Sequence, residues 1–277
     1  MPGWRNCSLG NWSNGVMGNT NTPTLQPAIA PVVVFEDDDL SVVDEPGGLE
    51  CHSAQRPGQV SLADWVREHL ADTRKRVPPE GRASARPPVR FINRLDRETS
   101  GLVVVAKNER AAKILGKQVL RREMEKEYVA ICWGRLVEET GWIDQPIGLT
   151  NGALVHTKRV VDAAGQPSAT GYAVEQRLGG FTVVRLRPRT GRTHQLRVHL
   201  AWLGHPIVGD KVYGPDERWY LRFIEDGVTE EMLRELLLPR HALHAAAVTL
   251  THPTTQQRCQ WAAPLPADLR QFIEDHR

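Results

Sequence analysis

The residues best suited to chemistry stand together in one short segment. Arg94, Asp96 and Arg97 come directly before a Thr-Ser-Gly turn at 99–101, and an apolar run follows over 102–106. Nearby cations stabilise the charged form of a carboxylate, and an ionised carboxylate at the edge of a strand can act as a nucleophile or a general base. A surface cluster of salt bridges before a core strand explains the same residue types, and these residues alone favour that interpretation.

A second segment concentrates positive charge where a predicted strand, a loop and a helix meet. It holds five arginines within thirteen positions, namely Arg185, Arg187, Arg189, Arg192 and Arg197. Free N–H groups at a helix start add to the positive potential, which suits phosphate groups, and at least one of Arg192 and Arg197 is expected to bind an anion. His194 and His199 lie five positions apart, not the four of a helical zinc pair, so no metal site is predicted.

The net charge of the chain hides a strong asymmetry between its parts. The 35 Lys and Arg against 33 Asp and Glu give a net charge of +2. Residues 71–200 nevertheless carry 24 basic and 13 acidic side chains, a net +11, whereas the parts before and after sum to −6 and −3. The middle of the chain is therefore predicted to form a face that binds a polyanion. A solvated surface whose charges balance after folding accounts for the counts equally well.

Composition and cysteine usage narrow the class of protein. The 277 residues are 40% hydrophobic and 25% charged, which is ordinary for a globular protein and excludes collagen-like, coiled-coil and wholly disordered chains. The 4 cysteines are far apart and form no C-x-x-C pair, so disulfide frameworks and zinc clusters are not expected. Because the sequence lacks a secretory signal and any run of about 20 apolar residues, a soluble, cytoplasmic protein without a membrane span is expected.

Short apolar segments separated by turn residues predict the elements that must position these side chains. Strands are expected over 32–35, 40–43, 102–106, 127–133, 181–187 and 246–250, the last of them the final clear strand. Helices are expected from a Ser61 N-cap, over 112–119 with Ala112, Leu115 and Val119 inward, from a Thr193 cap to Gly204, and over 229–237. Because several strands follow one another closely, we predict an α+β fold. It would have a mixed, largely antiparallel sheet flanked by helices, with a basic cleft.

Two parts of the chain are predicted to lie outside this framework. Residues 1–30 are rich in Gly, Asn, Ser, Thr and Pro, so we expect a flexible tail before one domain over 31–277. Residues 71–90 combine six Arg or Lys with four prolines, which indicates a basic loop and neither a helix nor a central strand. That loop either contacts a polyanion or is a disordered spacer.

Five short motifs follow one another along the chain. They are Arg94-Leu95-Asp96-Arg97 with Thr99-Ser100-Gly101; Glu127-Tyr128-Val129-Ala130; Gly191-Arg192-Thr193-His194-Gln195-Leu196-Arg197-Val198-His199; Gly204-His205-Pro206-Ile207-Val208-Gly209-Asp210 with Tyr213-Gly214; and Leu243-His244-Ala245. Together they closely resemble the signatures of the ribosomal large-subunit pseudouridine synthases of the RluA type, and the resemblance spans roughly residues 31–265. One such motif is weak evidence, but five in the family's order make a strong match.

The resemblance implies a pseudouridine synthase catalytic domain that isomerises uridine to pseudouridine in ribosomal or transfer RNA, without a metal or other cofactor. It implies that Asp96 is the essential carboxylate, which attacks the nucleoside or removes a sugar proton, and that Arg197 is its ion-pair partner. Tyr128 is expected to stack on the uracil and to handle the proton at C5. Contacts to substrate or RNA are implied for Leu243, Arg94, Arg192, His194 and Gln195, with Leu243 against the other face of the base and Arg94 at the flipped-out nucleotide.

The chain departs from the family pattern at two positions. Glu45-Pro46 stands where Lys-Pro is common, and Asn93 stands where His is frequent. Neither position touches the implied chemistry, so both bear on substrate identity more than on activity. The roughly 30 residues before the first strand leave no room for the family's frequent N-terminal S4 module, so RNA binding is expected to rest on the catalytic domain and its basic middle.

Two other functions are compatible with the same residues. One is an RNA-binding protein that has the fold and lacks catalysis, and the other is a glycosylase that releases a free base from nucleic acid. The presence of Asp96, Tyr128 and Arg197 together favours the isomerase. A monomer is expected, and the sequence leaves open which RNA and which uridine are recognised, because such specificity comes from shape contacts spread over loops.

Overall fold

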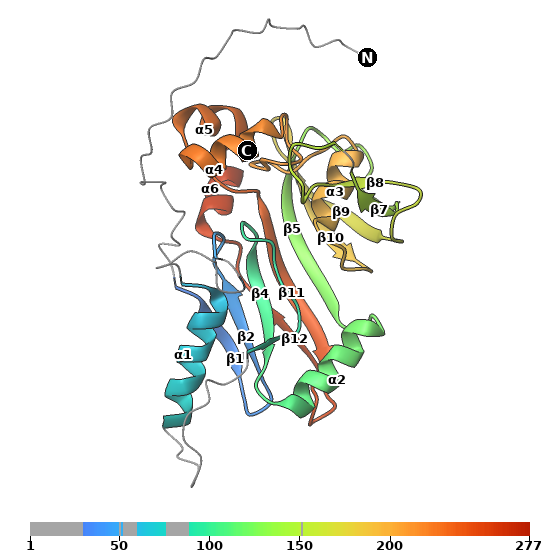
Figure 1. Cartoon of the computed structure of the whole chain (residues 1–277). Helices are drawn as coiled ribbons and strands as arrows, with labels where there is room; N and C mark the ends of the chain where they lie inside the picture. Colours follow the sequence, from blue (N-terminus) through green and yellow to red (C-terminus); the bar gives the residue numbers. More distant parts are fainter. Residues whose placement is uncertain (1–29, 50, 52–59, 76–88, 151) are drawn as a thin grey trace, which may run out of the picture.

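One large mixed sheet organises the computed structural model, which describes residues 30–49, 51, 60–75, 89–150 and 152–277 (Figure 1). Its strands are β1 (Val32–Glu36), β2 (Leu40–Glu45), β3 (Arg90–Phe91), β4 (Ser100–Ala106), β5 (Glu125–Trp133), β6 (Thr140–Asp144), β9 (Ala169–Arg177), β10 (Phe181–Pro188), β11 (Leu243–Thr251) and β12 (Arg258–Ala262). Their order is β1-β2-β4-β11-β5-β10-β9-β6, with β3 paired to β4 and β12 paired to β11. The β4–β11 pair is parallel and the other described pairs are antiparallel, which confirms the predicted mixed sheet.

A small sheet and six helices complete the described part of the chain. The small sheet pairs β7 (Ile147–Leu149) with β8 (Arg159–Val161). The helices are α1 (Leu62–Lys75), α2 (Glu109–Leu120), α3 (Gln195–Trp202), α4 (Arg218–Asp226), α5 (Glu230–Leu236) and α6 (Ala267–Asp275). Figure 1 shows α2 at one end of the long strands β5 and β11, and α4, α5 and α6 gathered at the other end. None of these helices is long and apolar enough to cross a membrane.

The parallel contact between β4 and β11 brings distant parts of the chain together. Ser100 pairs with His244, and Gly101 pairs with Ala245. Gly101 has φ 114°, and a Cβ placed there would lie 2.3 Å from the carbonyl oxygen of Ala245, so only glycine fits. The Thr-Ser-Gly turn before β4 is therefore pressed against the start of β11, beside Leu243.

Local sequence patterns predict several elements correctly. Helix α1 begins after Ser61, whose hydroxyl accepts a hydrogen bond from the Asp64 amide at 3.2 Å, and Leu62 and Val66 are buried as expected. The apolar run at 102–106 lies within β4 and is buried throughout, as are the two residues before it in the strand. These predictions succeed because the signals lie within a few neighbouring residues.

The predicted loop over 71–90 is wrong at both of its ends. Helix α1 continues to Lys75, where no proline has yet interrupted it, and Arg90 already belongs to β3. Residues 76–88, which hold the four prolines, lie outside the described residues. So does the tail predicted over 1–30, except for its last residue.

Two further predictions about elements are wrong. Val119 of α2 is 40% exposed, because Gln118 takes the inward position and its side-chain amide exchanges hydrogen bonds of 2.6 and 2.9 Å with the backbone of Thr251. These two hydrogen bonds to the end of β11 outweigh the burial of one apolar side chain. The strand over 246–250 is not the last one either, since β12 follows and pairs with it.

Candidate active site

A cavity of about 800 Å³ opens where the β3–β4 loop, β5, the end of α2, the β10–α3 loop and the start of β11 meet. Asp96 is the single carboxylate among the residues that line it. Six cationic side chains share that lining, namely Arg94, Arg122, Lys126, Arg189, Arg192 and Arg197. Part of the charge excess predicted for the middle of the chain therefore lies at one cavity, and the cleft is basic.

The β3–β4 loop that carries Asp96 is fixed at both ends. The Asn93 side chain donates to the carbonyl of Leu102 at 3.0 Å and accepts from the amide of Val104 at 2.8 Å, which continues the pairing with β4. At the other end the Thr99 amide donates to the carbonyl of Asp96 at 2.8 Å, closing a tight turn. Asn93, at the position where the family often has His, thus holds the loop in place.

Two buried histidines form hydrogen bonds with the Thr-Ser-Gly segment. The Thr99 hydroxyl lies 2.7 Å from Nε2 of His241, and the Ser100 hydroxyl lies 3.0 Å from Nδ1 of His244. Burial lowers the pKa of both imidazoles, that of His244 to about 4. Thr99 and Ser100, where the loop enters β4, are consequently held by neutral hydrogen-bonding partners.

A buried arginine joins Asp96 to a second carboxylate. Arg197 donates from Nε and Nη2 to both oxygens of Asp210, at 2.6 and 2.8 Å, and from Nη1 to Oδ2 of Asp96 at 3.1 Å. Asp210 also accepts the amides of Val212 and Tyr213. Burial alone would raise the pKa of Asp210, but the charge of Arg197 and the hydrogen bonds from Arg197 and the Tyr213 amide together outweigh it, so the pKa lies below its usual range. This pair therefore stays ionised and fixes the guanidinium.

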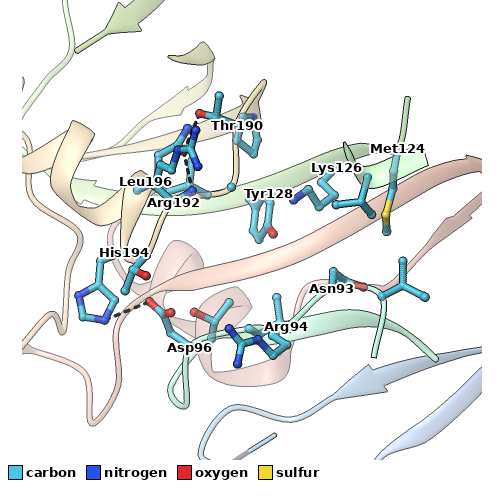
Figure 2. A pocket seen from close by; sticks show the side chains of 18 of the residues that line it. Asn93, Arg94, Asp96, Met124, Lys126, Tyr128, Thr190, Arg192, His194 and Leu196 are labelled. Carbon is cyan, nitrogen blue, oxygen red and sulfur yellow. Dashed lines mark hydrogen bonds and ion pairs between the residues drawn. The ribbon is translucent and has the colours of Figure 1, made fainter. Parts of the chain in front are cut away.

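The carboxylate of Asp96 is held on one oxygen only. Oδ2 contacts Arg197 and lies 3.9 Å from Nε2 of His194, whereas Oδ1 accepts no hydrogen bond from the described residues. The side chain is 32% exposed and points into the cavity in Figure 2. Oδ1 is thus the oxygen that a substrate can reach.

Helix α3 begins one residue later than its sequence predicts, with His194 at its start. His194 occupies the N-cap position with φ 57°, in the left-handed region, so the predicted Thr193 cap is wrong. Its Nδ1 lies 2.9 Å from the hydroxyl of Tyr213, and the other ring nitrogen faces Asp96. Burial and the charge of Arg197 lower the pKa of His194 to about 4, so the ring is neutral at pH 7.

The walls on either side of Asp96 are largely apolar. Tyr128 reaches into the cavity from β5 (Figure 2) and is 8% exposed. Leu243 at the start of β11 also lines the cavity and is 4% exposed. Burial raises the pKa of the Tyr128 hydroxyl, and the charge of Asp96 raises it further. The phenol therefore stays protonated at neutral pH.

The sequence over 39–202 matches the family model described as RNA pseudouridylate synthase. The chain belongs to the RNA pseudouridylate synthase family. Membership places it among the enzymes that isomerise uridine in RNA, and it agrees with the resemblance carried by the five motifs.

Relatives and solved structures support the same family. The chain is 36% identical over 247 residues to ribosomal large subunit pseudouridine synthase D of Nitrosomonas europaea, covering 89% of this chain and 65% of that protein. It is 37% identical to the protein of the same name from Pseudomonas aeruginosa, covering 85% of this chain and 68% of that one. The structure of human RNA pseudouridylate synthase domain containing 1 superposes with a TM-score of 0.65 at 26% identity, covering 91% of this chain and 97% of that one.

Gln195 is one residue for which the resemblance implies an RNA contact that its hydrogen bonds leave no group to make. Gln195 is 4% exposed and its amide is fully used: it donates to Ala169 and Thr170 and accepts from Thr190 and Arg192. A side-chain amide has two donor hydrogens and one oxygen with two lone pairs. All of these are used within the protein, so no donor or acceptor remains for RNA. The expectation of an RNA contact at Gln195 is therefore replaced by a role in holding the β10–α3 loop.

Sequence reasoning misses three residues that the structure brings to the site. Asp210 and Tyr213 belong to a motif noted only for its resemblance, and nothing local marks one as the buried partner of Arg197 and the other as the partner of His194. Lys126 stands next to the noted Glu127-Tyr128 motif and lines the cavity. No group of three or more His, Cys, Asp or Glu in the described ranges could hold a metal ion.

Proposed function

We propose that this protein isomerises a uridine of large-subunit ribosomal RNA to pseudouridine and that Asp96 is its reactive carboxylate. One observation carries the proposal: Asp96 is the only carboxylate among the residues that line a cation-rich cavity, and a buried arginine orients it. The relatives named as ribosomal large subunit pseudouridine synthases support the choice of RNA. A cytoplasmic monomer that works without metal or cofactor is part of the proposal.

The reaction exchanges one bond to the sugar for another. The bond between N1 of the base and C1′ breaks, the base turns, and a bond between C5 and C1′ forms. The proton lost from C5 is balanced by a proton gained at N1, so substrate and product have the same composition. Oδ1 of Asp96, left open to the cavity, either attacks the nucleoside or removes a sugar proton, while Arg197 holds Oδ2 and balances the charge.

The uridine must leave its stack to reach Asp96. Flipping costs a few kcal/mol, less for an unpaired base. In the proposal Tyr128 and Leu243 receive the two faces of the uracil, and Arg94 in the same loop as Asp96 holds the RNA open. Since the Tyr128 hydroxyl stays protonated, this residue serves as a stacking ring and a hydrogen-bond donor and does not accept the C5 proton as an anion.

The test is the Asp96→Asn variant, assayed on ribosomal RNA from cells that lack the gene. Loss of the ionised carboxylate is expected to lower pseudouridine formation by more than about a thousandfold, with folding and RNA binding retained. Asp226→Asn, an exposed aspartate at the end of α4, is the control and keeps full activity. Turnover by Asp96→Asn near the control rate would refute the role of Asp96.

Two other results of that assay would replace the proposed function. If the wild-type protein binds the RNA and no uridine changes, the protein is an RNA-binding member of the family without catalysis. If free base appears and the RNA loses mass, it is a glycosylase, because pseudouridine has the same mass as uridine.

A further inference from the structure

Lys126 is a charged side chain of the cavity that the chemistry above does not use. It stands two positions before Tyr128 on β5, so both side chains lie on the same face of the strand. Figure 2 shows its amine beside the Tyr128 ring, on the side away from Asp96. The side chain is half-buried, and burial lowers the pKa of its amine.

The carboxylates nearest to Lys126 in sequence are engaged elsewhere. Glu125 pairs with Arg258, and Glu127 pairs with Arg185 and Arg187 on the opposite face of the strand. No carboxylate of the described residues forms an ion pair with Lys126, and the single carboxylate of the cavity already binds Arg197. The ammonium group thus enters the cavity without a counter-charge from the described part of the protein.

The β10–α3 loop covers the Lys126 amine without a side chain between them. A Cβ added to Gly191 would lie 3.6 Å from the Lys126 nitrogen, so the amine rests against bare backbone there. A partly desolvated cation without an anion is unfavourable, and a charge-assisted hydrogen bond to an anion is favourable in the same place. A ligand that brings a negative charge therefore gains more from Lys126 than a neutral base does.

From this placement we infer that Lys126 binds a phosphodiester group next to the target uridine. The inference rests on the proposed function, in which the uracil lies between Tyr128 and Leu243 and Asp96 reaches the nucleoside. Lys126 lies beyond Tyr128 as seen from Asp96. The inference places the RNA backbone next to the bound nucleoside on that side of Tyr128. An ammonium group is a compact donor that suits a single phosphate oxygen, and RNA supplies that anion at every linkage.

The experiment uses the full chain and a short RNA around the modified uridine, once a pseudouridine map has located it. Lys126→Met keeps the length of the side chain and removes its charge. We expect KM to rise about tenfold, kcat to change less than about twofold, and the salt dependence of binding to fall by about one ion. Lys126→Arg, which keeps the charge, is expected to recover most of the affinity. Lys117→Met, an exposed lysine in the last turn of α2 that does not line the cavity, is the matched control.

A neutral linkage identifies the partner of Lys126 directly. A methylphosphonate placed 5′ or 3′ of the target uridine is expected to weaken binding to the wild type about tenfold at one of the two positions, and to have no such effect on Lys126→Met. Equal losses in both proteins at both positions would overturn the inference, as would a Lys126→Met variant with lower kcat and unchanged KM. The same binding cycle is run with Asp96→Asn, so the loss of affinity is measured without turnover and is separate from the role of Asp96 in the reaction.

Discussion

The cationic side chains on two sides of one cavity differ in how they are paired with carboxylates. On the inner side Arg197 is buried between Asp210 and Asp96, and every nitrogen of its guanidinium donates to a carboxylate. On the outer side Arg94, Lys126 and Arg192 line the cavity and form no ion pair with the described residues. The two sides therefore differ in whether each cation has a carboxylate partner among the described residues.

This difference separates positioning from binding. A buried ion pair is costly to form and more costly to break, so it is suited to holding one geometry. An unpaired cation in a cavity gains most when a ligand brings the missing anion. The inner side can therefore fix the carboxylate that reacts, while the outer side supplies the affinity for RNA.

Asp210→Asn is the change that most disturbs the inner side. It removes the charge that compensates Arg197 and is expected to cost about 3–5 kcal/mol of unfolding free energy. Misplacement of Arg197 and Asp96 is expected to lower kcat about a hundredfold, with RNA affinity almost unchanged. Urea denaturation and single-turnover assays at saturating RNA measure the two effects.

Asp268→Asn is the matched control for that experiment. Asp268 also binds an arginine through both oxygens, at 2.7 and 3.0 Å from Arg240, but its side chain is 36% exposed and does not line the cavity. We expect a loss of about 1 kcal/mol or less and normal kcat. Equal behaviour of the two variants would show that the inner side has no special role.

Acid is expected to lower the unfolding free energy through buried histidines near the inner side of the cavity. The folded protein holds His194 and His244 with pKa values of about 4, whereas an unfolded histidine titrates near 6.5. The unfolded state therefore binds more protons between these values, and the unfolding free energy falls as pH drops from about 6.5 towards 4. Each histidine accounts for up to about 3 kcal/mol of this fall in unfolding free energy, because one unit of pKa corresponds to about 1.4 kcal/mol.

Non-titrating variants separate the two histidines in denaturation measurements across that pH range. His194→Asn suits the left-handed backbone, which asparagine tolerates, and His244→Gln keeps a polar group beside Ser100. Each variant is expected to lose its share of the pH dependence. A pH dependence identical to that of the wild type in both variants would contradict this assignment.

The parts that sequence predicts well depend on neighbouring residues. Asp96 stands out because charged residues, a turn and a buried strand follow one another within a few positions, and Ser61 caps α1 through contacts within three residues. The mixed sheet follows from the spacing of its strands. For Asp96 and Ser61 the signal and its consequence lie in the same segment.

The parts that sequence misses depend on partners far along the chain. Gln118 displaces Val119 from the inward face of α2 because it meets the backbone of Thr251, 133 positions later. Asp210 and Asp96 share one guanidinium although 114 positions separate them. Lys126 is masked by its neighbours, since a lysine between two glutamates predicts a paired surface charge, and only the alternation of the strand turns it away from both.

Arg192→Gln probes the outer side with the smallest expected effect. Arg192 is half-buried at the cavity and one of several cations there, so its loss should raise KM for RNA about threefold and lower the salt dependence of binding by about one ion. Arg187→Gln is its control, because Arg187 is 61% exposed and similarly placed in sequence but pairs with Glu127 outside the cavity. Its charge is already balanced, so KM and the salt dependence should stay at the wild-type values. If both arginines matter equally, affinity follows the total positive charge of the segment, and pairing with a carboxylate is not what distinguishes the two sides of the cavity.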